Sequence, residues 1–207
     1  MILGITGGTG CGKTTLLNLI RQRGGLVLDC DEIYHHLLQS DNSLLGSIQS
    51  RFPEAFEGGQ LNRKRLGGIV FGNPAALEDL NAITHQAVRR RVLQALEMNP
   101  RHAAIDAIGL FESGLNRLCD VTVAVTAPLE ERVARLMARD GISEDYARSR
   151  IAAQHDEVWF RQRCDFLLEN HGTKADFQEK CVAFLDANGI IAVETPIPNS
   201  VEKETDS

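Results

Sequence analysis

The hydrophobic pattern at the start of the chain predicts a strand, a loop, a helix and a second strand. An apolar run at residues 1–5 precedes a cluster of glycines, and apolar residues then recur at helical spacing over residues 13–20. Gly24 and Gly25 end this helix, and residues 26–28 indicate a short buried strand that closes on Asp29, Cys30 and Asp31. These elements complete a βαβ unit of about thirty residues.

The middle of the chain, residues 33–100, has a helical pattern. It is interrupted by Gly58-Gly59, by Gly67-Gly68 and by Gly72-Asn73-Pro74, and its longest amphipathic stretch covers residues 75–98. We therefore expect a helical insertion beside the sheet.

Strand and helix patterns alternate in the last part of the chain. Strand-like runs lie at residues 103–108, 121–126 and 166–168, and helical segments lie at residues 129–139, 144–154 and 174–188. The apolar run at residues 189–194 can be a further strand or not, and the polar tail at residues 196–207 is expected to fray. This alternation predicts an α/β fold, in which helices cover both faces of a parallel sheet.

Composition narrows the class of protein. The 207 residues fit one domain, and a net charge of −6 gives no global basic field, so a general nucleic-acid binder is disfavoured. We expect no membrane span, because no stretch approaches the roughly 20 apolar residues that a bilayer requires. The first residues have too short an apolar run and too many glycines for a signal peptide, so we expect a cytoplasmic protein. The five cysteines include no Cys-x-x-Cys pair, so we expect reduced thiols. The oligomeric state stays open.

A phosphate-binding loop is the strongest motif. Residues 7–14, GGTGCGKT, match the pattern G-x-x-x-x-G-K-[ST] between a predicted strand and a helix. Glycines let such a loop turn its N–H groups toward a phosphate, and the helix dipole adds favourable potential. The predicted nucleotide-binding residues are Gly8, Thr9, Gly10, Cys11, Gly12, Lys13, Thr14 and Thr15. Lys13 is expected to reach the β- and γ-phosphates, Thr14 to ligate Mg²⁺, and Thr15 to contact the α-phosphate.

Cys11 lies inside this loop and has two interpretations. It is a small spacer, or it is a thiol that the helix N-terminus acidifies and makes reactive.

The loop alone leaves several classes of nucleotide-binding protein open. Residues 106–109 spell D-x-x-G, as in a GTPase switch, but no Asn-Lys-x-Asp sequence follows to read guanine. A kinase is therefore favoured over a GTPase.

From residue 2 to about residue 172, a series of segments resembles the dephospho-coenzyme A kinase family. The matching segments are residues 3–8 (LGITGG), 29–35 (DCDEIYH), 61–63 (LNR), 80–85 (LNAITH), 106–112 (DAIGLFE) and 135–140 (RLMARD), followed by Gln154, Asp165 and Asn170. The departures are Cys30 for alanine, Gln86 for proline, Ile108 and Gly109 for Pro-Leu, Arg132 for glutamine and Phe160 for lysine. Arg161 or Arg163 could supply the charge that is missing at Phe160.

The resemblance implies a P-loop three-layer sandwich that uses ATP and Mg²⁺ to phosphorylate the ribose 3′-hydroxyl of dephospho-CoA. It implies one kinase domain over residues 1–207, with a core at about 1–34, 101–136 and 164–195. A helical CoA-binding insertion at about 35–100 and a lid at about 137–163 complete the expected organisation. A P-loop kinase of another nucleoside or nucleotide, or an ATP-binding protein without turnover, remains the alternative.

The resemblance also assigns roles to individual side chains. Asp31 is expected to orient or deprotonate the acceptor hydroxyl together with the catalytic charges of Lys13 and Arg139, although Asp31 could instead cap a helix. Arg135 and Arg139 lie four residues apart, on one helix face, and are expected to face the ATP phosphates. The expected substrate contacts are Arg63, His85 and Asp106, and Asp106 can also hold Mg²⁺ through water.

Overall fold

The computed structural model describes residues 1–98 and 100–190. The strands are β1 (Ile2–Thr6), β2 (Leu26–Asp29), β3 (Phe56–Glu57), β4 (Gln60–Leu61), β5 (Ala103–Asp106), β6 (Val121–Thr126) and β7 (Phe166–Glu169). The α-helices are α1 (Lys13–Gln22), α2 (Cys30–Ser40), α3 (Asn42–Arg51), α4 (Arg63–Val70), α5 (Pro74–Glu97), α6 (Leu129–Asp140), α7 (Glu144–Ala152), α8 (Glu157–Arg163) and α9 (Lys174–Ala187). Two 3₁₀ turns, η1 (Pro53–Ala55) and η2 (Leu115–Leu118), complete the described elements.

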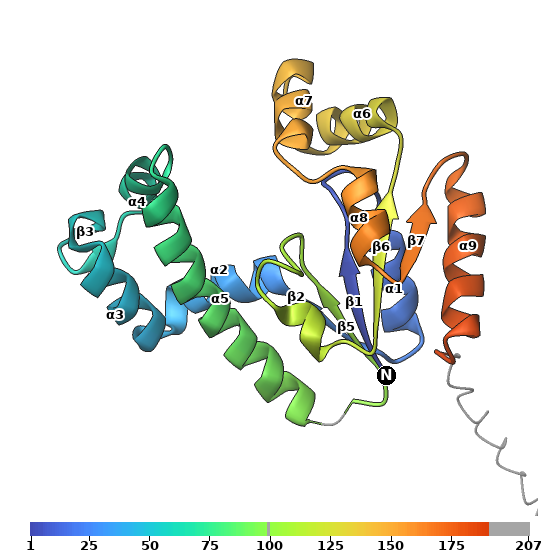
Figure 1. The fold of residues 1–207 in the computed structure, drawn as a ribbon, viewed down its shortest axis with the longest axis horizontal. Helices are drawn as coiled ribbons and strands as arrows, with labels where there is room; N and C mark the ends of the chain where they lie inside the picture. Colours follow the sequence, from blue (N-terminus) through green and yellow to red (C-terminus); the bar gives the residue numbers. More distant parts are fainter. Residues whose placement is uncertain (99, 191–207) are drawn as a thin grey trace, which may run out of the picture.

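Five strands form one parallel sheet in the order β2-β5-β1-β6-β7. The central strand β1 pairs with β5 on one side and with β6 on the other, and Leu3 and Ile5 of β1 are fully buried. Because all five strands run the same way, their carboxyl ends meet at one edge, which is the upper edge in Figure 1. The predicted parallel α/β sheet is therefore confirmed.

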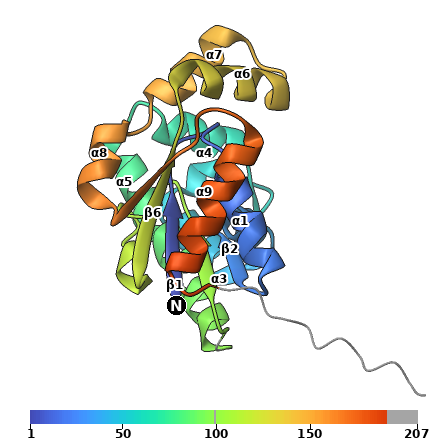
Figure 2. The same ribbon diagram turned by 90° about the vertical axis from the view of Figure 1, so that its right-hand side faces the viewer.

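Helices cover both faces of this sheet. Helices α1 and α9 pack against one face, where Leu16, Ile20 and Phe177 belong to a buried cluster with β1 and β6. Helices α2 and α5 and the segment after β5 form the buried cluster on the opposite side, with Val92 and Leu110 fully buried. In Figure 2, α1 and α9 lie together on one side of the sheet, and α5 and α8 lie on the other.

Two parts of the chain project beyond the sheet. Helices α3, α4 and the outer end of α5 extend to one side, and α6 and α7 stand above the carboxyl edge (Figure 1). Helices α6 and α7 have a small core of their own, made by Val133, Leu136, Ala147 and Ile151. Both projections border the edge where ligands bind in open α/β sheets.

The structure corrects two details of the predicted pattern. Strands β3 and β4 form a short antiparallel hairpin around Gly58-Gly59, a place where only helices were expected. Helix α2 begins at Cys30, and Asp29 caps it by accepting hydrogen bonds from the backbone N–H groups of Asp31 and Glu32. The interpretation of Asp31 as the helix cap is therefore wrong. Most of the run at residues 189–194 and the whole tail at residues 196–207 lie outside the described residues.

Across residues 1–98 and 100–190, no helix combines the length and the apolar character that spanning a bilayer would require.

The first glycine of the P-loop generates a prediction about stability. Gly7 has φ +126°, and a Cβ built on it would lie 2.2 Å from the backbone oxygen of Val125 in β6. We expect Gly7→Ala to lower the free energy of unfolding by about 2 kcal/mol or more, because neither backbone can move away cheaply. Urea unfolding of the ligand-free protein measures this.

The matched control is Gly68→Ala. Gly68 lies within α4, and a Cβ there would meet nothing within 4 Å. We expect this variant to keep its stability or to gain about 0.5–1 kcal/mol. Equal unfolding midpoints for Gly7→Ala and the unmodified protein would contradict the steric argument.

Candidate active site

The P-loop follows the carboxyl end of β1 and leads into α1. Gly7, Gly10 and Gly12 have φ values of +126°, +77° and +95°, which L side chains rarely adopt. Gly12 is the N-cap of α1, so the loop leads directly into the positive end of a helix dipole. Backbone N–H groups arranged in this way make an anion site, as the motif predicted.

Contacts from several elements hold this loop in place. The Asn170 side chain, which is buried at the end of β7, donates a hydrogen bond of 2.8 Å from Nδ2 to the Cys11 carbonyl oxygen. From α6, Arg132 Nε donates to the Thr9 carbonyl oxygen at 3.0 Å, and Arg135 donates to the Gly10 carbonyl oxygen at 3.2 Å. Three carbonyl oxygens of the loop are thus bound by side chains from other elements.

Lys13 lies inside the site between the loop and a carboxylate. Its Nζ donates to the Gly7 carbonyl oxygen at 3.0 Å and lies 4.0 Å from Asp106 Oδ1. Both side chains are largely buried, with 14% and 13% exposed. The ammonium group is therefore fixed beside the centre of the cradle.

Three carboxylates converge at the same edge of the sheet. Asp29 and Asp106 occupy paired positions at the ends of β2 and β5, and Asp31 lies in the first turn of α2. Burial raises the pKa of Asp106 to about 6; the charge of Lys13 opposes the rise, and the charges of Asp29 and Asp31 add to it. Among the described residues, Asp106 Oδ1 is buried without a hydrogen-bond partner. Such an oxygen is poised to accept a cation or a water bound to one.

Two cavities meet at Asp31 and Ile108, which line both. The larger, which we call the P-loop cavity, has a volume of about 690 Å³. Its walls are Gly8 to Thr14 of the loop, the three carboxylates, and Arg135, Arg139 and Arg150 from α6 and α7. It combines an anion cradle with a ring of charged side chains.

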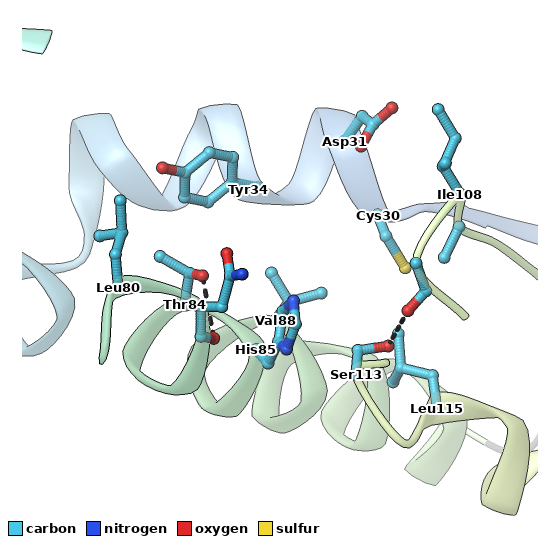
Figure 3. A pocket seen from close by; sticks show the side chains of 13 residues that line it. Cys30, Asp31, Tyr34, Leu80, Thr84, His85, Val88, Ile108, Ser113 and Leu115 are labelled. Atoms are coloured by element: carbon cyan, nitrogen blue, oxygen red, sulfur yellow. Dashed lines mark hydrogen bonds between the residues drawn. The ribbon is translucent and has the colours of Figure 1, made fainter. Parts of the chain in front are cut away.

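The smaller cavity, which we call the α2–α5 cavity, has a volume of about 220 Å³ and lies between these two helices (Figure 3). Its further lining residues are Cys30, Tyr34, Leu80, Asn81, Thr84, His85, Val88, Ala107, Gly109, Ser113 and Leu115. Burial lowers the pKa of His85, and the charge of Glu112 opposes this shift. Burial also raises the pKa of Tyr34, with the charge of Arg63 opposing. The cavity is mainly apolar and carries a few polar groups, a composition typical of small-molecule sites.

The structure brings most of the predicted site residues together. Lys13, Thr14, Asp31 and Asp106 line the P-loop cavity, as do the arginines Arg135 and Arg139 of α6. Among the described residues, Arg139 binds Asp140 with two hydrogen bonds, and Asp140 also binds Arg150 of α7. His85 lines the α2–α5 cavity, whereas Arg63 lines neither cavity.

Some predicted roles find no support in the placement. Thr15 faces a separate hollow beside Lys174 and Gln178. Arg161 binds Glu157 and Glu169, and Arg163 lies over the ring of Trp159, and neither side chain lines the P-loop cavity. Phe160 itself is buried.

Cys11 is 2% exposed and belongs to the hydrophobic core beneath the loop. Burial raises the pKa of its thiol, and the charges of Arg132 and Lys13 oppose the rise only in part. This environment favours the interpretation as a small spacer over that of a reactive thiol.

Sequence reasoning missed several residues that line the cavities. Tyr34 lies three residues after Asp31, about one helical turn, so helical periodicity could have found it, whereas Thr84 directly precedes His85. Arg150 comes from α7, beyond the arginine pair of α6, and no local pattern marks it. The contact of Arg132 with Thr9 depends on the packing of α6 and is likewise invisible in sequence.

Comparisons with known proteins agree on one family. The family described as dephospho-CoA kinase matches residues 1–176. The curated dephospho-CoA kinase of Latilactobacillus sakei is 36% identical over 83% of this chain and 87% of its own length. A crystal structure from Thermus thermophilus has a TM-score of 0.79 and 35% identity, and it covers 91% of this chain and 97% of that one. The dephospho-CoA kinase of Campylobacter jejuni gives a TM-score of 0.64 at 27% identity, covering 92% and 98% of the two chains. The chain therefore belongs to the dephospho-CoA kinase family.

Proposed function

We propose that this protein transfers the γ-phosphoryl group of ATP to the ribose 3′-hydroxyl of dephospho-CoA, which completes coenzyme A. The observation that carries the proposal is the position of Asp31, which lines both the P-loop cavity and the α2–α5 cavity. A phosphoryl group that leaves a nucleotide in the first cavity reaches an acceptor in the second beside this carboxylate. Membership of the family supports the choice of acceptor.

In this proposal the P-loop cavity binds the phosphates of ATP. Backbone N–H groups of the P-loop and the dipole of α1 hold the β-phosphate, and Lys13 stabilises the charge that develops on the transferred group. Because Lys13 is fixed by Gly7 and Asp106, its ammonium group does not need to reorganise during transfer. Arg135 and Arg139 approach the phosphates from α6.

The donor set in the P-loop cavity fits Mg²⁺. Thr14 offers a hydroxyl, and Asp106 offers a buried oxygen that has no hydrogen-bond partner among the described residues. Mg²⁺ binds through one or two protein oxygens together with phosphates and water, so it does not need a cluster of protein ligands. When bound, it would neutralise phosphate charge.

The α2–α5 cavity receives the acceptor in this proposal. His85 and Tyr34 lie on facing helices, and Figure 3 shows Asp31 at the end of the cavity beside Ile108. With Asp29 capping α2, the Asp31 carboxylate is free to accept a hydrogen bond from the acceptor hydroxyl. Arg63 and the outer helices can bind the remainder of the substrate only outside the cavity, since its volume of about 220 Å³ is too small for all of it.

An acceptor panel tests the proposed function. ATP consumption is measured with dephospho-CoA, CMP, AMP, shikimate and water as acceptors. We expect dephospho-CoA to be preferred. Equal or better turnover of CMP or AMP would favour a kinase of another nucleotide, and ATP binding without turnover of any acceptor would favour a binding protein.

Asp31→Asn separates chemistry from structure. We expect kcat to fall by roughly 10² or more while the affinity for ATP changes little, because the amide can neither take the proton nor keep the charge. Glu32→Gln is the matched control, since Glu32 lies in the same first turn of α2 but lines neither cavity. A near-normal kcat in folded Asp31→Asn protein would end the catalytic assignment.

The raised pKa of Asp106 generates a prediction about pH. Because the folded state holds the proton more tightly than the unfolded chain, protonated Asp106 stabilises the fold below about pH 4. That contribution is lost as the pH rises through the folded pKa of about 6. At pH 8, without nucleotide or Mg²⁺, the free energy of unfolding of Asp106→Asn should therefore be about 2–3 kcal/mol higher than that of the unmodified protein.

The difference should become small near pH 3, where Asp106 is protonated in the folded state and mostly protonated in the unfolded chain. Urea unfolding at the two pH values measures it, and Glu54→Gln, at an exposed carboxylate, is the control. Lower stability of Asp106→Asn at pH 8 would show that the contact with Lys13 outweighs the desolvation of the carboxylate.

A further inference from the structure

The short segment between α7 and α8 contacts two loops that border the cavities through two consecutive residues. It runs down from α7 to α8 in Figure 1 and carries Gln154 and His155. Gln154 reaches the P-loop, whereas His155 reaches the loop after β5. The proposed nucleotide binding and phosphoryl transfer involve neither side chain.

Gln154 holds the middle of the P-loop. Its Oε1 accepts a hydrogen bond of 2.8 Å from the Thr9 N–H group and a second, of 3.2 Å, from Arg132. Because Arg132 also donates to the Thr9 carbonyl oxygen, both polar backbone groups of Thr9 are bound by this pair of side chains. Thr9 lines the P-loop cavity, so a movement of this residue on phosphate binding must shift or break the contact with Gln154.

His155 holds the loop that connects β5 to η2. Its Nε2 lies 2.7 Å from Glu112 Oε1, and since an ionised carboxylate only accepts, the imidazole donates. The imidazole stacks on the Trp159 ring at 3.8 Å with an interplanar angle of 1°, and Phe111 packs edge-on against the same indole at 5.5 Å. Phe111 and Glu112 therefore both rest on the column formed by His155 and Trp159.

The loop held in this way forms part of the α2–α5 cavity. Ile108, Gly109 and Ser113 line that cavity, and Phe111 and Glu112 lie between them in sequence. The Glu112–His155 pair is about half exposed, at 42% and 45%, so an isolated pair of this kind would hold the loop weakly. The stack on Trp159 orients the imidazole, and the contact of Phe111 with the same indole adds a second point at which the loop is held.

We propose that Gln154 and His155 are positioning residues that make nucleotide and acceptor binding cooperative. Gln154 senses the P-loop through Thr9, and His155 transmits its position to the acceptor loop through Glu112 and Trp159. The inference rests on the proposed function, because it takes dephospho-CoA as the ligand of the α2–α5 cavity. Coupling of this kind is reciprocal: each ligand tightens the other by the same factor.

Calorimetric titration tests the coupling directly. The probe is the non-hydrolysable ATP analogue AMP-PNP with Mg²⁺, titrated with and without saturating dephospho-CoA, and the reverse titration is also performed. We expect each ligand to lower the Kd of the other by about 5-fold or more in the unmodified protein. His155→Ala and Gln154→Ala should reduce this factor to below about 2-fold.

Two further substitutions separate the contacts of His155. His155→Phe retains an aromatic ring for the stack on Trp159 but loses the hydrogen bond to Glu112, and His155→Gln does the reverse. If both contacts are required, each variant shows an intermediate coupling factor. His36→Ala, at an exposed histidine that contacts Ser40 of its own helix, is the control and should keep full coupling.

Trp159 is the only tryptophan in the sequence, so tryptophan fluorescence reports on the surroundings of this one side chain. AMP-PNP with Mg²⁺, added without acceptor, should change its emission, and Gln154→Ala should abolish the change. This measurement separates the two possible failures. If dephospho-CoA neither binds nor turns over, the proposed function fails, while the fluorescence still tests the link from nucleotide to loop.

Three results would overturn the inference itself. The first is a coupling factor of one in an active unmodified protein, and the second is unchanged coupling in folded His155→Ala. The third is a Trp159 emission that does not change when AMP-PNP and Mg²⁺ bind. A lower melting temperature of His155→Ala with full coupling would mean that the column only packs the fold.

Discussion

The site depends on holding the P-loop backbone in conformations that it would not keep alone. Three of its glycines have positive φ values that L side chains rarely adopt, and its Thr9, Gly10 and Cys11 carbonyl oxygens accept hydrogen bonds from other elements. Those carbonyl oxygens are bound by Asn170, Arg132 and Arg135, which come from two separate parts of the chain. The sheet supplies the remaining constraint, because Gly7 is pressed against the backbone of β6. The anion site is therefore a product of the whole fold.

Three carboxylates lie together at the same edge of the sheet, and burying one of them does not stabilise the fold. Asp106 is buried, its Oδ1 has no hydrogen-bond partner within residues 1–98 and 100–190, and its pKa is raised to about 6. A structure selected for stability alone would place a neutral residue there. Ligands that bring positive charge would relieve this cost, so the unfavourable desolvation in the free protein becomes affinity for Mg²⁺ in the proposed complex.

Local patterns predicted the parts of the structure that local physics decides. The P-loop, the βαβ unit and the alternating helices and strands follow from glycine positions and apolar spacing, which act within a few residues. The hairpin of β3 and β4 was not predicted, because strands of two residues are too short to show a hydrophobic periodicity. Asp29, rather than Asp31, caps α2 because the helix begins at Cys30, two residues earlier than a cap at Asp31 would require. The sequence did not predict the contacts of Arg150, Arg132 and His155, because these contacts join segments that are far apart in the chain.

The arginines at the P-loop cavity form ion pairs with carboxylates that a phosphate group could replace. Arg139 and Arg150 share Asp140, and Arg135 binds Glu131 of its own helix. These ion pairs are solvent-accessible, and exposed pairs contribute little because water screens them and the long side chains lose freedom. A phosphate group offers more charge and more acceptor oxygens than a single carboxylate, so it can compete for the same guanidinium groups. The carboxylates of α6 then keep the arginines ordered and near the cavity before the nucleotide arrives. The proposed phosphate contacts therefore need only local rearrangements of side chains that already face the site.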